Sequence, residues 1–355
     1  MATIDTVWRA RDTKPGDIDA ALRASLAQIH RDNAGYVPAR VLNLVCVVDK
    51  QYSGEIANRL RRVGRYHPSR TIVCSVDPKR TTLDAVATIA APSEVREGEI
   101  GLLRETVVVE CGTRHLANLD RIVDPLVVTD LLTCVWAPHG HTEAVDSLLD
   151  LSQIVLLDSV DEPEPADALA RALELSKQAY VVDLAWLRST PWRERLAATF
   201  DPDTVRPELN TIDGITIRHH PDSAAAAVLL VGWLASRLGW RVDRLLPSRG
   251  GGVLEGKVHA RRQDVKVRLE ADPQQQVRGL AGLSISTASG RTYSLDRGPG
   301  GLRAHFQNRR GETRDWTILG ASRGEAGILG EGIRQALLRD GTYGPALACA
   351  NGLLR

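Results

Sequence analysis

Val41-Leu42-Asn43-Leu44-Val45-Cys46-Val47-Val48 is a nearly unbroken apolar run, and such a run is typical of a strand buried on both faces of a parallel sheet. Four further short runs of similar composition follow, at residues 71–76, 106–110, 132–136 and 154–157. Helical periodicity lies between them, over residues 55–63, 115–123 and 143–151. This repeated order predicts an α/β domain with a mostly parallel, doubly wound sheet over residues 36–160.

The segments around this domain have different patterns. From about Asp17 to Asp32 apolar side chains lie three or four apart, which predicts a helix within an N-terminal extension at residues 1–35. Residues 158–167 read DSVDEPEPAD, so we expect an acidic linker and helix at 161–179. From Val253 onward, apolar and polar residues alternate between turns, which indicates an antiparallel meander within an α+β C-terminal domain at 180–345. Residues 346–355 are expected to form a tail.

The charge is balanced overall but uneven along the chain. The 355 residues hold 45 Lys and Arg against 44 Asp and Glu, a net charge of +1. Residues 1–240 carry 26 bases and 33 acids, hence −7, and residues 241–355 carry 19 and 11, hence +8. A uniformly basic nucleic-acid-binding protein is therefore excluded. The basic second domain, with Tyr293, Phe306 and Trp316, keeps nucleic-acid binding open as an alternative.

Other sequence features predict a cytoplasmic protein. The N-terminus lacks the apolar core of a signal peptide. The longest apolar stretch, at residues 224–235, is too short for a membrane helix and is expected to be a buried helix capped by Gly239. Five cysteines without a CxxC pair fit a reducing compartment. We expect no membrane association.

The sequence lacks the usual nucleotide-binding motifs. The predicted strands end in Asp49, Asp77 and Glu110 without a G-x-G-x-x-G turn, and acidic side chains there would repel a pyrophosphate. Residues 251–257 satisfy G-x4-G-K, but Val258 stands where a P-loop needs Ser or Thr, and a strand pattern follows. No cofactor is expected.

Catalytic and metal-binding patterns are missing as well. His139 and His141 flank Gly140, and His219 precedes His220, but neither pair has partners at the spacing of a zinc site. Ser159 follows a predicted strand without the glycines of a nucleophile elbow. We therefore predict no metal site, no catalytic residue and no enzymatic activity.

Residues 183–193, DLAWLRSTPWR, combine Trp and Arg at high density. These residue types are enriched at interface hot spots, because each covers a large area and also donates hydrogen bonds. Thr190 and Pro191 are expected to start a helix. We predict a partner interface at Trp186, Arg188, Trp192 and Arg193; the alternative is that both tryptophans belong to the core.

Several short motifs resemble the OpcA family, the glucose-6-phosphate dehydrogenase assembly proteins of actinobacteria and cyanobacteria. They lie in one order over residues 40–240. The matching residues are Arg40-Val41-Leu42-Asn43-Leu44, His67-Pro68-Ser69-Arg70, Asp158-Ser159, Asp183-Leu184-Ala185-Trp186, Thr190-Pro191-Trp192-Arg193, Phe200-Asp201-Pro202 and Gly232-Trp233-Leu234-Ala235-Ser236-Arg237-Leu238-Gly239-Trp240.

The resemblance implies a non-catalytic assembly factor and allosteric activator of glucose-6-phosphate dehydrogenase in the oxidative pentose phosphate pathway. It would act by protein–protein binding that favours the active oligomer. The alternatives are nucleic-acid binding by the basic C-terminal domain and a sugar-phosphate-binding sensor that uses the same arginines.

Overall fold

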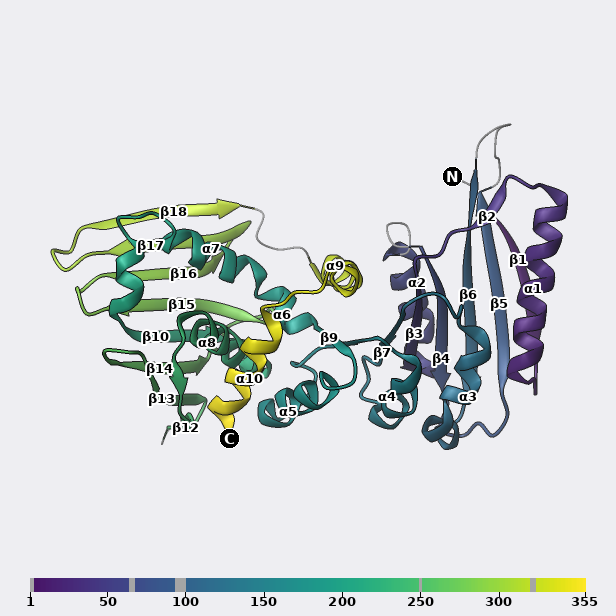
Figure 1. The fold of residues 1–355 in the computed structure, drawn as a ribbon, viewed down its shortest axis with the longest axis horizontal. Helices are drawn as coiled ribbons and strands as arrows, with labels where there is room; N and C mark the ends of the chain where they lie inside the picture. Colours follow the sequence, from purple (N-terminus) through teal and green to yellow (C-terminus); the bar gives the residue numbers. More distant parts are fainter. Residues whose placement is uncertain (1–2, 64–67, 93–99, 249–250, 320–323) are drawn as a thin grey trace. The chain divides into compact units, whose positions relative to one another are not determined.

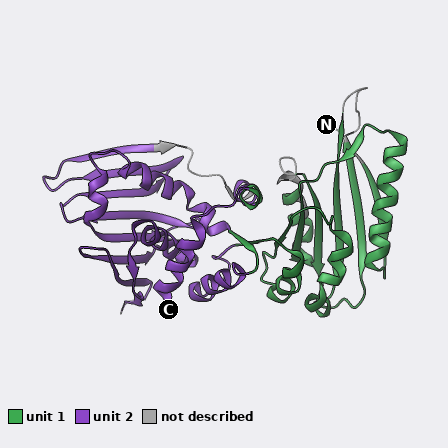
Figure 2. Cartoon of the chain, in the orientation of Figure 1, with its two compact units in different colours: residues 1–157, 178–182, 333–337 green, residues 158–177, 183–332, 338–355 purple. Residues whose placement is uncertain are grey.

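A computed structural model describes residues 3–63, 68–92, 100–248, 251–319 and 324–355 (Figure 1). The chain forms two compact units (Figure 2). Unit 1 comprises residues 1–157, 178–182 and 333–337, and unit 2 comprises 158–177, 183–332 and 338–355. Each unit is built around a mixed sheet, so the prediction of two domains that combine helices and strands is confirmed at this level.

The sheet of unit 1 has the order β1-β5-β6-β4-β3-β7-β8-β9, with β2 beside β6. Its strands are β1 (Thr3–Ala10), β2 (Tyr36–Pro38), β3 (Leu42–Asp49), β4 (Ser69–Val76), β5 (Asp84–Pro92), β6 (Gly101–Cys111), β7 (Thr133–Trp136), β8 (Ile154–Leu157) and β9 (Tyr180–Asp183). The five apolar runs of the sequence lie in β3, β4, β6, β7 and β8, which pair in parallel. β5 and β1 extend the sheet antiparallel from β6.

Helices of unit 1 follow the predicted segments in part. They are α1 (Pro15–Asp32), α2 (Ser53–Val63), α3 (Asp120–Val123) and α4 (Thr142–Leu148), with 3-10 turns η1 (Lys50–Tyr52), η2 (Thr113–Asn118), η3 (Asp124–Leu126) and η4 (Leu149–Leu151). Residues 1–35, expected as a helical extension, also contain strand β1. This strand is an exposed edge of the sheet with charged side chains, so it has no apolar run.

The sheet of unit 2 has the order β11-β13-β14-β10-β15-β16-β17-β18, with β12 beside β13. Its strands are β10 (Ile212–His219), β11 (Arg241–Val242), β12 (Leu246–Pro247), β13 (Val253–His259), β14 (Asp264–Ala271), β15 (Leu280–Thr287), β16 (Thr292–Gly298), β17 (Gly301–Gln307) and β18 (Thr313–Leu319). β10 lies between β14 and β15, parallel to the first and antiparallel to the second. The antiparallel meander expected from Val253 onward is interrupted once: β15 to β18 pair antiparallel in sequence order, but β10 separates β14 from β15, which are consecutive in sequence.

Helices of unit 2 include one in the segment expected as an acidic linker and helix and one in the segment expected as a tail. The helices are α5 (Pro165–Leu175), α6 (Leu184–Arg188), α7 (Thr190–Phe200), α8 (Ala224–Leu238) and α10 (Tyr343–Leu354), with 3-10 turns η5 (Arg206–Thr211) and η6 (Pro221–Ser223); α9 (Gly324–Leu338) contributes to both units. Most of residues 161–179 form α5, and residues 346–355 lie almost entirely within α10. Both helices are partly buried, so neither segment is a free connection.

Helix α8 forms the apolar centre of unit 2. It begins after Ser223 and ends at Gly239, whose φ of 65° is the left-handed conformation that glycine adopts without strain. This confirms the predicted helix end. Among the described residues, no helix combines the length and apolarity that crossing a membrane requires.

Gly232 brings α8 against α10. A Cβ atom added at Gly232 would lie 2.4 Å from the carbonyl oxygen of Ala346 and 2.8 Å from the backbone nitrogen of Ala350. Because backbone atoms of a packed helix cannot move aside cheaply, we expect Gly232→Ala to lower the free energy of unfolding of unit 2 by about 2 kcal/mol. Urea unfolding followed by circular dichroism measures this change.

Gly344 supplies the matched control for that measurement. It lies in α10, and a Cβ atom added there would meet no heavy atom within 4 Å. Gly344→Ala should therefore be neutral or stabilising by up to about 1 kcal/mol. Equal destabilisation by both substitutions would contradict the close helix packing at Gly232.

Candidate functional site: a buried polar cluster in unit 2

Asp183 is the centre of a buried polar cluster that contains much of the 183–193 motif. Only 1% of Asp183 is exposed. Its carboxylate caps α6 by accepting from the backbone N–H of Ala185 at 2.9 Å, as an N-cap residue does. It also accepts from the Ser159 backbone N–H at 3.1 Å, from the Ser159 hydroxyl, and from the Tyr343 hydroxyl at 3.1 Å. These bonds join three segments that are distant in sequence.

Asp158 and Arg188 form a second part of the cluster. A guanidinium nitrogen of Arg188 lies 2.6 Å from a carboxylate oxygen of Asp158, and the two side chains are 13% and 6% exposed. Burial raises the pKa of Asp158 to about 7, although the nearby Arg188 opposes the shift. Burial also raises the pKa of Asp183. The residues that sequence composition assigned to an acidic linker thus begin with a buried ion pair.

Trp186 forms the third part of the cluster, together with Arg193 and Asp340. The indole Nε1 donates to the Asp340 carboxylate at 2.8 Å. The Arg193 guanidinium carbon lies 3.4 Å from the indole ring centroid, a cation–π contact. Arg193 also donates to Thr190 Oγ1 at 2.8 Å and to the Trp186 carbonyl at 3.2 Å. Burial lowers the pKa of Arg193 to about 10, which leaves it charged at neutral pH.

The four residues predicted as a partner interface are thus placed inside unit 2. Trp186, Trp192 and Arg193 are 2%, 3% and 8% exposed, and Arg188 is half-buried. This burial favours the alternative that both tryptophans belong to the core. Asp340 and Tyr343 also belong to the cluster, and the sequence reasoning missed them. They lie more than 150 positions after Asp183, and no local pattern marks them.

The remaining motif residues have structural contacts of their own. Arg70 is the second residue of β4 and forms a buried ion pair with Glu105 at 2.7 Å. Ser69 begins the strand and contacts Thr71, and Pro68 precedes it. His67 lies outside the described residues. In α7, Pro191 occupies the first turn as expected, but the N-cap is Ser189 and not Thr190, since the helix starts one residue earlier. Trp233 is half-buried and Trp240 is buried.

The carboxyl rim of unit 1 is the place where open α/β sheets usually bind ligands. We define it as Asp49, Lys50, Asp77, Arg80 and Glu110, which follow or end β3, β4 and β6. Lys50 lies 3.0 Å from Asp77 and 3.4 Å from Glu110, and Arg80 contacts Glu110 as well. The rim's cations are therefore already paired with its carboxylates.

The histidines beside this rim contact Asp49. His141 Nε2 lies 3.0 Å from the Asp49 carboxylate, and His139 Nδ1 accepts from the Asp49 backbone N–H at 3.1 Å. Both histidines therefore make polar contacts at the end of β3. Within the described residues, no three His, Cys, Asp or Glu side chains are grouped as a metal would require.

The remaining candidate residues have structural surroundings too. His219 is buried, and its neighbour His220 accepts from the Asp222 backbone N–H. The Gly-rich segment at 251–257 leads into β13, where Lys257 lies 3.3 Å from Asp264. Burial raises the pKa of Cys111 to about 11 and of Cys134 to about 12, so their reactive thiolate forms are scarce.

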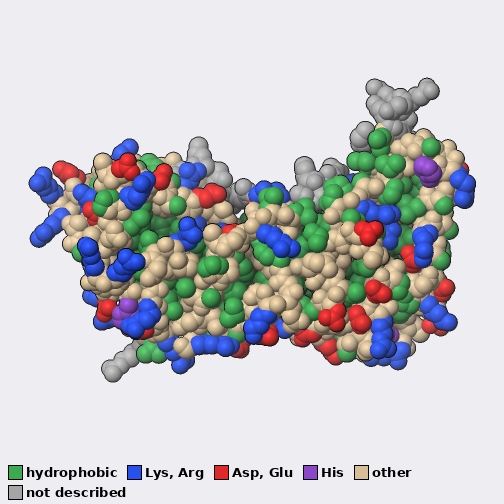
Figure 3. Space-filling view, in the orientation of Figure 1, with side chains coloured by type: hydrophobic (Ala, Val, Ile, Leu, Met, Phe, Trp, Pro, Cys, Tyr) green, Lys and Arg blue, Asp and Glu red, His purple; other side chains and the backbone are tan. Residues whose placement is uncertain are grey.

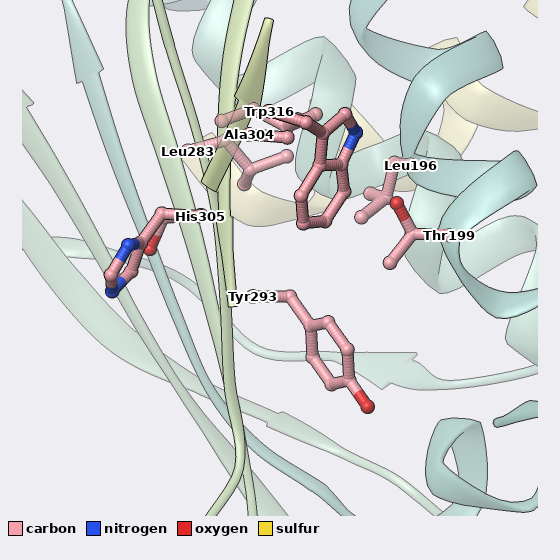
Figure 4. A pocket seen from close by; sticks show the side chains of 9 residues that line it. Leu196, Thr199, Leu283, Tyr293, Ala304, His305 and Trp316 are labelled. Atoms are coloured by element: carbon pink, nitrogen blue, oxygen red, sulfur yellow. The ribbon is translucent and has the colours of Figure 1, made fainter. Parts of the chain in front are cut away.

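A small pocket lies between α7 and the sheet of unit 2 (Figure 4). Its volume of about 10 Å³ is close to the space of one water molecule, which is too small for a sugar phosphate. Figure 4 shows Tyr293 and Trp316 pointing to the helix side of the sheet and His305 to the other side.

Of the three aromatic residues of the nucleic-acid alternative, Trp316 is 38% exposed, whereas Phe306 is half-buried and Tyr293 is buried. Tyr293 is 8% exposed and stacks with Phe200 and Phe306, at centroid distances of 4.9 and 5.1 Å. Bases need exposed rings on which to stack. On the face that Figure 3 draws, acidic side chains also lie among the basic ones of unit 2. These observations weigh against the nucleic-acid alternative.

Comparisons with known proteins place most of the chain in one family. Residues 60–174 match the model described as the glucose-6-phosphate dehydrogenase subunit N-terminal domain, and residues 179–344 match the one described as its C-terminal domain. A Synechocystis protein provisionally named OxPP cycle protein OpcA is 32% identical over 130 residues, 35% of this chain and 27% of that protein. The equally named protein of Nostoc punctiforme is 33% identical over 132 residues, 35% of this chain and 28% of that protein.

The aligned segment thus spans less than a third of these relatives' lengths. In structure, the chain is similar to the super-repressor mutant of Gal80p from Saccharomyces cerevisiae, with a TM-score of 0.50 and 10% identity. That likeness covers 87% of this chain and 94% of Gal80p. At this identity it concerns the fold alone.

Proposed function

Because the chain belongs to the OpcA family of glucose-6-phosphate dehydrogenase subunits, we propose that it is a non-catalytic partner of that dehydrogenase. It binds the enzyme in the oxidative pentose phosphate pathway and favours the enzyme's active oligomer. The partner is taken from the family description, and the non-catalytic role rests on the chemistry of unit 1.

The carboxyl rim is the observation that carries the non-catalytic role. A nicotinamide dinucleotide is bound at this edge through its pyrophosphate, which needs free backbone N–H groups and a positive field. Here the N–H of Asp49, at the end of β3, already donates to His139. Lys50 and Arg80 are occupied by Asp77, Asp84 and Glu110. The lysine, the arginine and the backbone N–H that could bind an anion at the rim are therefore already paired.

The buried cluster supports the proposal in another way. A partner can shift an enzyme between two states only through its different affinity for them. A binding surface that is already ordered loses less entropy on association, so more of its contact energy becomes affinity. We assign Trp186, Arg188, Trp192 and Arg193 to this positioning role, because their contacts hold α6 and α7 within unit 2.

The test is a steady-state assay of the dehydrogenase from the same organism. Initial rates are measured against glucose 6-phosphate concentration, with and without an equimolar amount of the full chain. We expect a lower apparent KM or a higher kcat, and co-elution of the two proteins in size-exclusion chromatography. An unrelated protein at equal concentration is the control. An unchanged curve together with separate elution would refute the partnership.

The chain alone is assayed in the same experiment for reduction of nicotinamide cofactor. No rate above background is expected. A rate that scales with the concentration of the chain would overturn the non-catalytic role while leaving the partnership to be judged by the first measurement.

A further inference from the structure

The sheet of unit 2 has one covered face and one open face. On β10, Ile215 and Ile217 are buried towards α8, and Thr216 and Arg218 on the opposite side remain partly exposed. β14 repeats this alternation, with Val267 buried and Lys266 and Arg268 exposed. We call the second side the open face.

Hydroxyl side chains occupy the middle of the open face. The strand register places Thr216, Ser284 and Ser294 side by side on β10, β15 and β16. The same cross-strand row continues to Arg268 and Glu255 at one end and to His305 and Asp315 at the other. One end is the Arg268–Glu255 ion pair at 3.2 Å, and at the other end His305 Nδ1 lies 2.6 Å from the Asp315 carboxylate. The row therefore has three hydroxyls between an Arg–Glu pair and a His–Asp pair.

In the adjacent cross-strand row of the open face, Gly282 leaves space for the side chains of its neighbours. A Cβ atom at Gly282 would lie 2.7 Å from the Arg218 guanidinium and 2.6 Å from the Asp296 carboxylate. The missing side chain lets Arg218 lie across β15, where it contacts Asp296 at 2.6 Å. The charge of Arg218 is thus paired with Asp296 and, at 3.2 Å, with Asp272, and its side chain remains 43% exposed.

The open face carries bases and acids in similar numbers. Its Lys and Arg residues are Lys257, Lys266, Arg218, Arg268 and Arg303, and its Asp and Glu residues are Glu255, Glu270, Asp264, Asp296 and Asp315. Asp213 accepts from Ser286 and Asp272 contacts Arg218, so both carboxylates also reach this face, and five bases stand against seven acids. A nucleic acid needs an excess of cations with phosphates as their counter-ions, and the ion pairs of this face leave no such excess.

Its area suits a stable protein interface. β13, β14, β10, β15, β16, β17 and β18 lie side by side. At about 4.8 Å between strands and about 3.3 Å per residue, seven strands of about seven residues cover near 800 Å². A standard interface buries about 800 Å² on each partner.

We propose that the open face is the interface through which a second copy of this chain binds as a two-fold dimer. An interface between identical copies must complement itself. Hydroxyl groups do so because each both donates and accepts, and a face that carries both cations and carboxylates can pair opposite charges with its copy. This proposal goes beyond the proposed function, since it concerns the chain's own assembly and not its contact with the dehydrogenase.

The test introduces a bulky charge at the centre of the open face. Ser284→Arg in the full chain would place an unpaired cation in the interface, and we expect the dimer Kd to rise at least about 30-fold. Sedimentation equilibrium should give twice 38.7 kDa for the unchanged chain and 38.7 kDa for the variant. Gln276→Arg, in an exposed loop after β14, is the matched control and should leave the dimer intact.

Circular dichroism and thermal unfolding establish that each variant is folded. Should Ser284→Arg fail to fold, Ser294→Glu on the neighbouring strand carries the same test. Three results would overturn the proposal: a monomeric unchanged chain at about 100 μM, well above the Kd of a stable dimer; a dimer that persists in folded open-face variants; or equal dissociation by Gln276→Arg. A monomeric chain whose open-face variants lose only the dehydrogenase would assign the face to that enzyme and also overturn the dimer.

Discussion

Replacing Trp186 with alanine is expected to lower the free energy of unfolding of unit 2 by about 4 kcal/mol. Truncating a large buried aromatic side chain costs about 3–5 kcal/mol, because apolar contact is lost and a cavity remains. Trp186 is 2% exposed, stacks against Tyr343 at 5.5 Å between ring centroids and lies beneath the Arg193 guanidinium. Its removal also leaves the Asp340 carboxylate without the indole donor. Urea unfolding of the full chain, followed by circular dichroism, measures the change.

Trp316 is the matched control, since it is the same residue type and lies in the same unit but is 38% exposed. Trp316→Ala should cost about 1 kcal/mol or less. The comparison separates loss of a buried contact from loss of a tryptophan in general. Equal costs for the two substitutions would mean that the cluster around Trp186 does not hold unit 2 together.

The sequence predicted the strands of unit 1 where apolar runs are continuous. β3 and β4 are buried on both faces. A strand buried on both faces needs apolar residues at nearly every position, so its sequence is a continuous apolar run. β1 and β5 were missed for the opposite reason. β1 is an edge strand with mostly exposed side chains, and β5 is rich in alanine, so neither has the run by which the others were recognised.

The insertion of β10 shows what order along the chain cannot predict. Turn residues between consecutive strands indicate hairpins, and the predicted meander assumed that every neighbour in sequence is a neighbour in the sheet. β14 and β15 are separated by β10, which precedes both in the chain and is divided from them by α8. The pairing of β10 with strands so much later in the chain depends on how α8 packs. No local sequence pattern in residues 253–319 indicates this pairing.

The Trp- and Arg-rich segment was recognised by its composition, but composition left open whether it belongs to an interface or to the core. Tryptophan and arginine close together are common both at interfaces and in buried cation–π pairs. The choice between these two depends on Asp340 and Tyr343, which accept from and donate to the motif residues from the other end of the chain. Only the folded chain brings them together.

Glu105→Gln is expected to lower the free energy of unfolding of unit 1 by about 3–5 kcal/mol. Glu105 is buried on β6 between two arginines, accepting from Arg40 Nε at 2.5 Å and from Arg70 Nε at 2.8 Å. Arg70 is itself only 5% exposed. The neutral amide removes the negative charge that pairs with Arg40 and Arg70. The Arg70 cation is then buried without a compensating charge, and breaking a buried ion pair in this way costs about 3–5 kcal/mol. Chemical unfolding monitored by circular dichroism gives the value.

Glu110, five residues later on the same strand, provides the control because it also contacts two cations but its side chain is 35% exposed. Water solvates Lys50 and Arg80 when this carboxylate is neutralised, so Glu110→Gln should cost about 1 kcal/mol or less. The two substitutions are chemically identical and differ in burial alone. If Glu110→Gln proved as costly as Glu105→Gln, the ion pairs of the carboxyl rim would stabilise unit 1 as strongly as the buried pair does. The rim would then not be an exposed edge whose cations water can solvate.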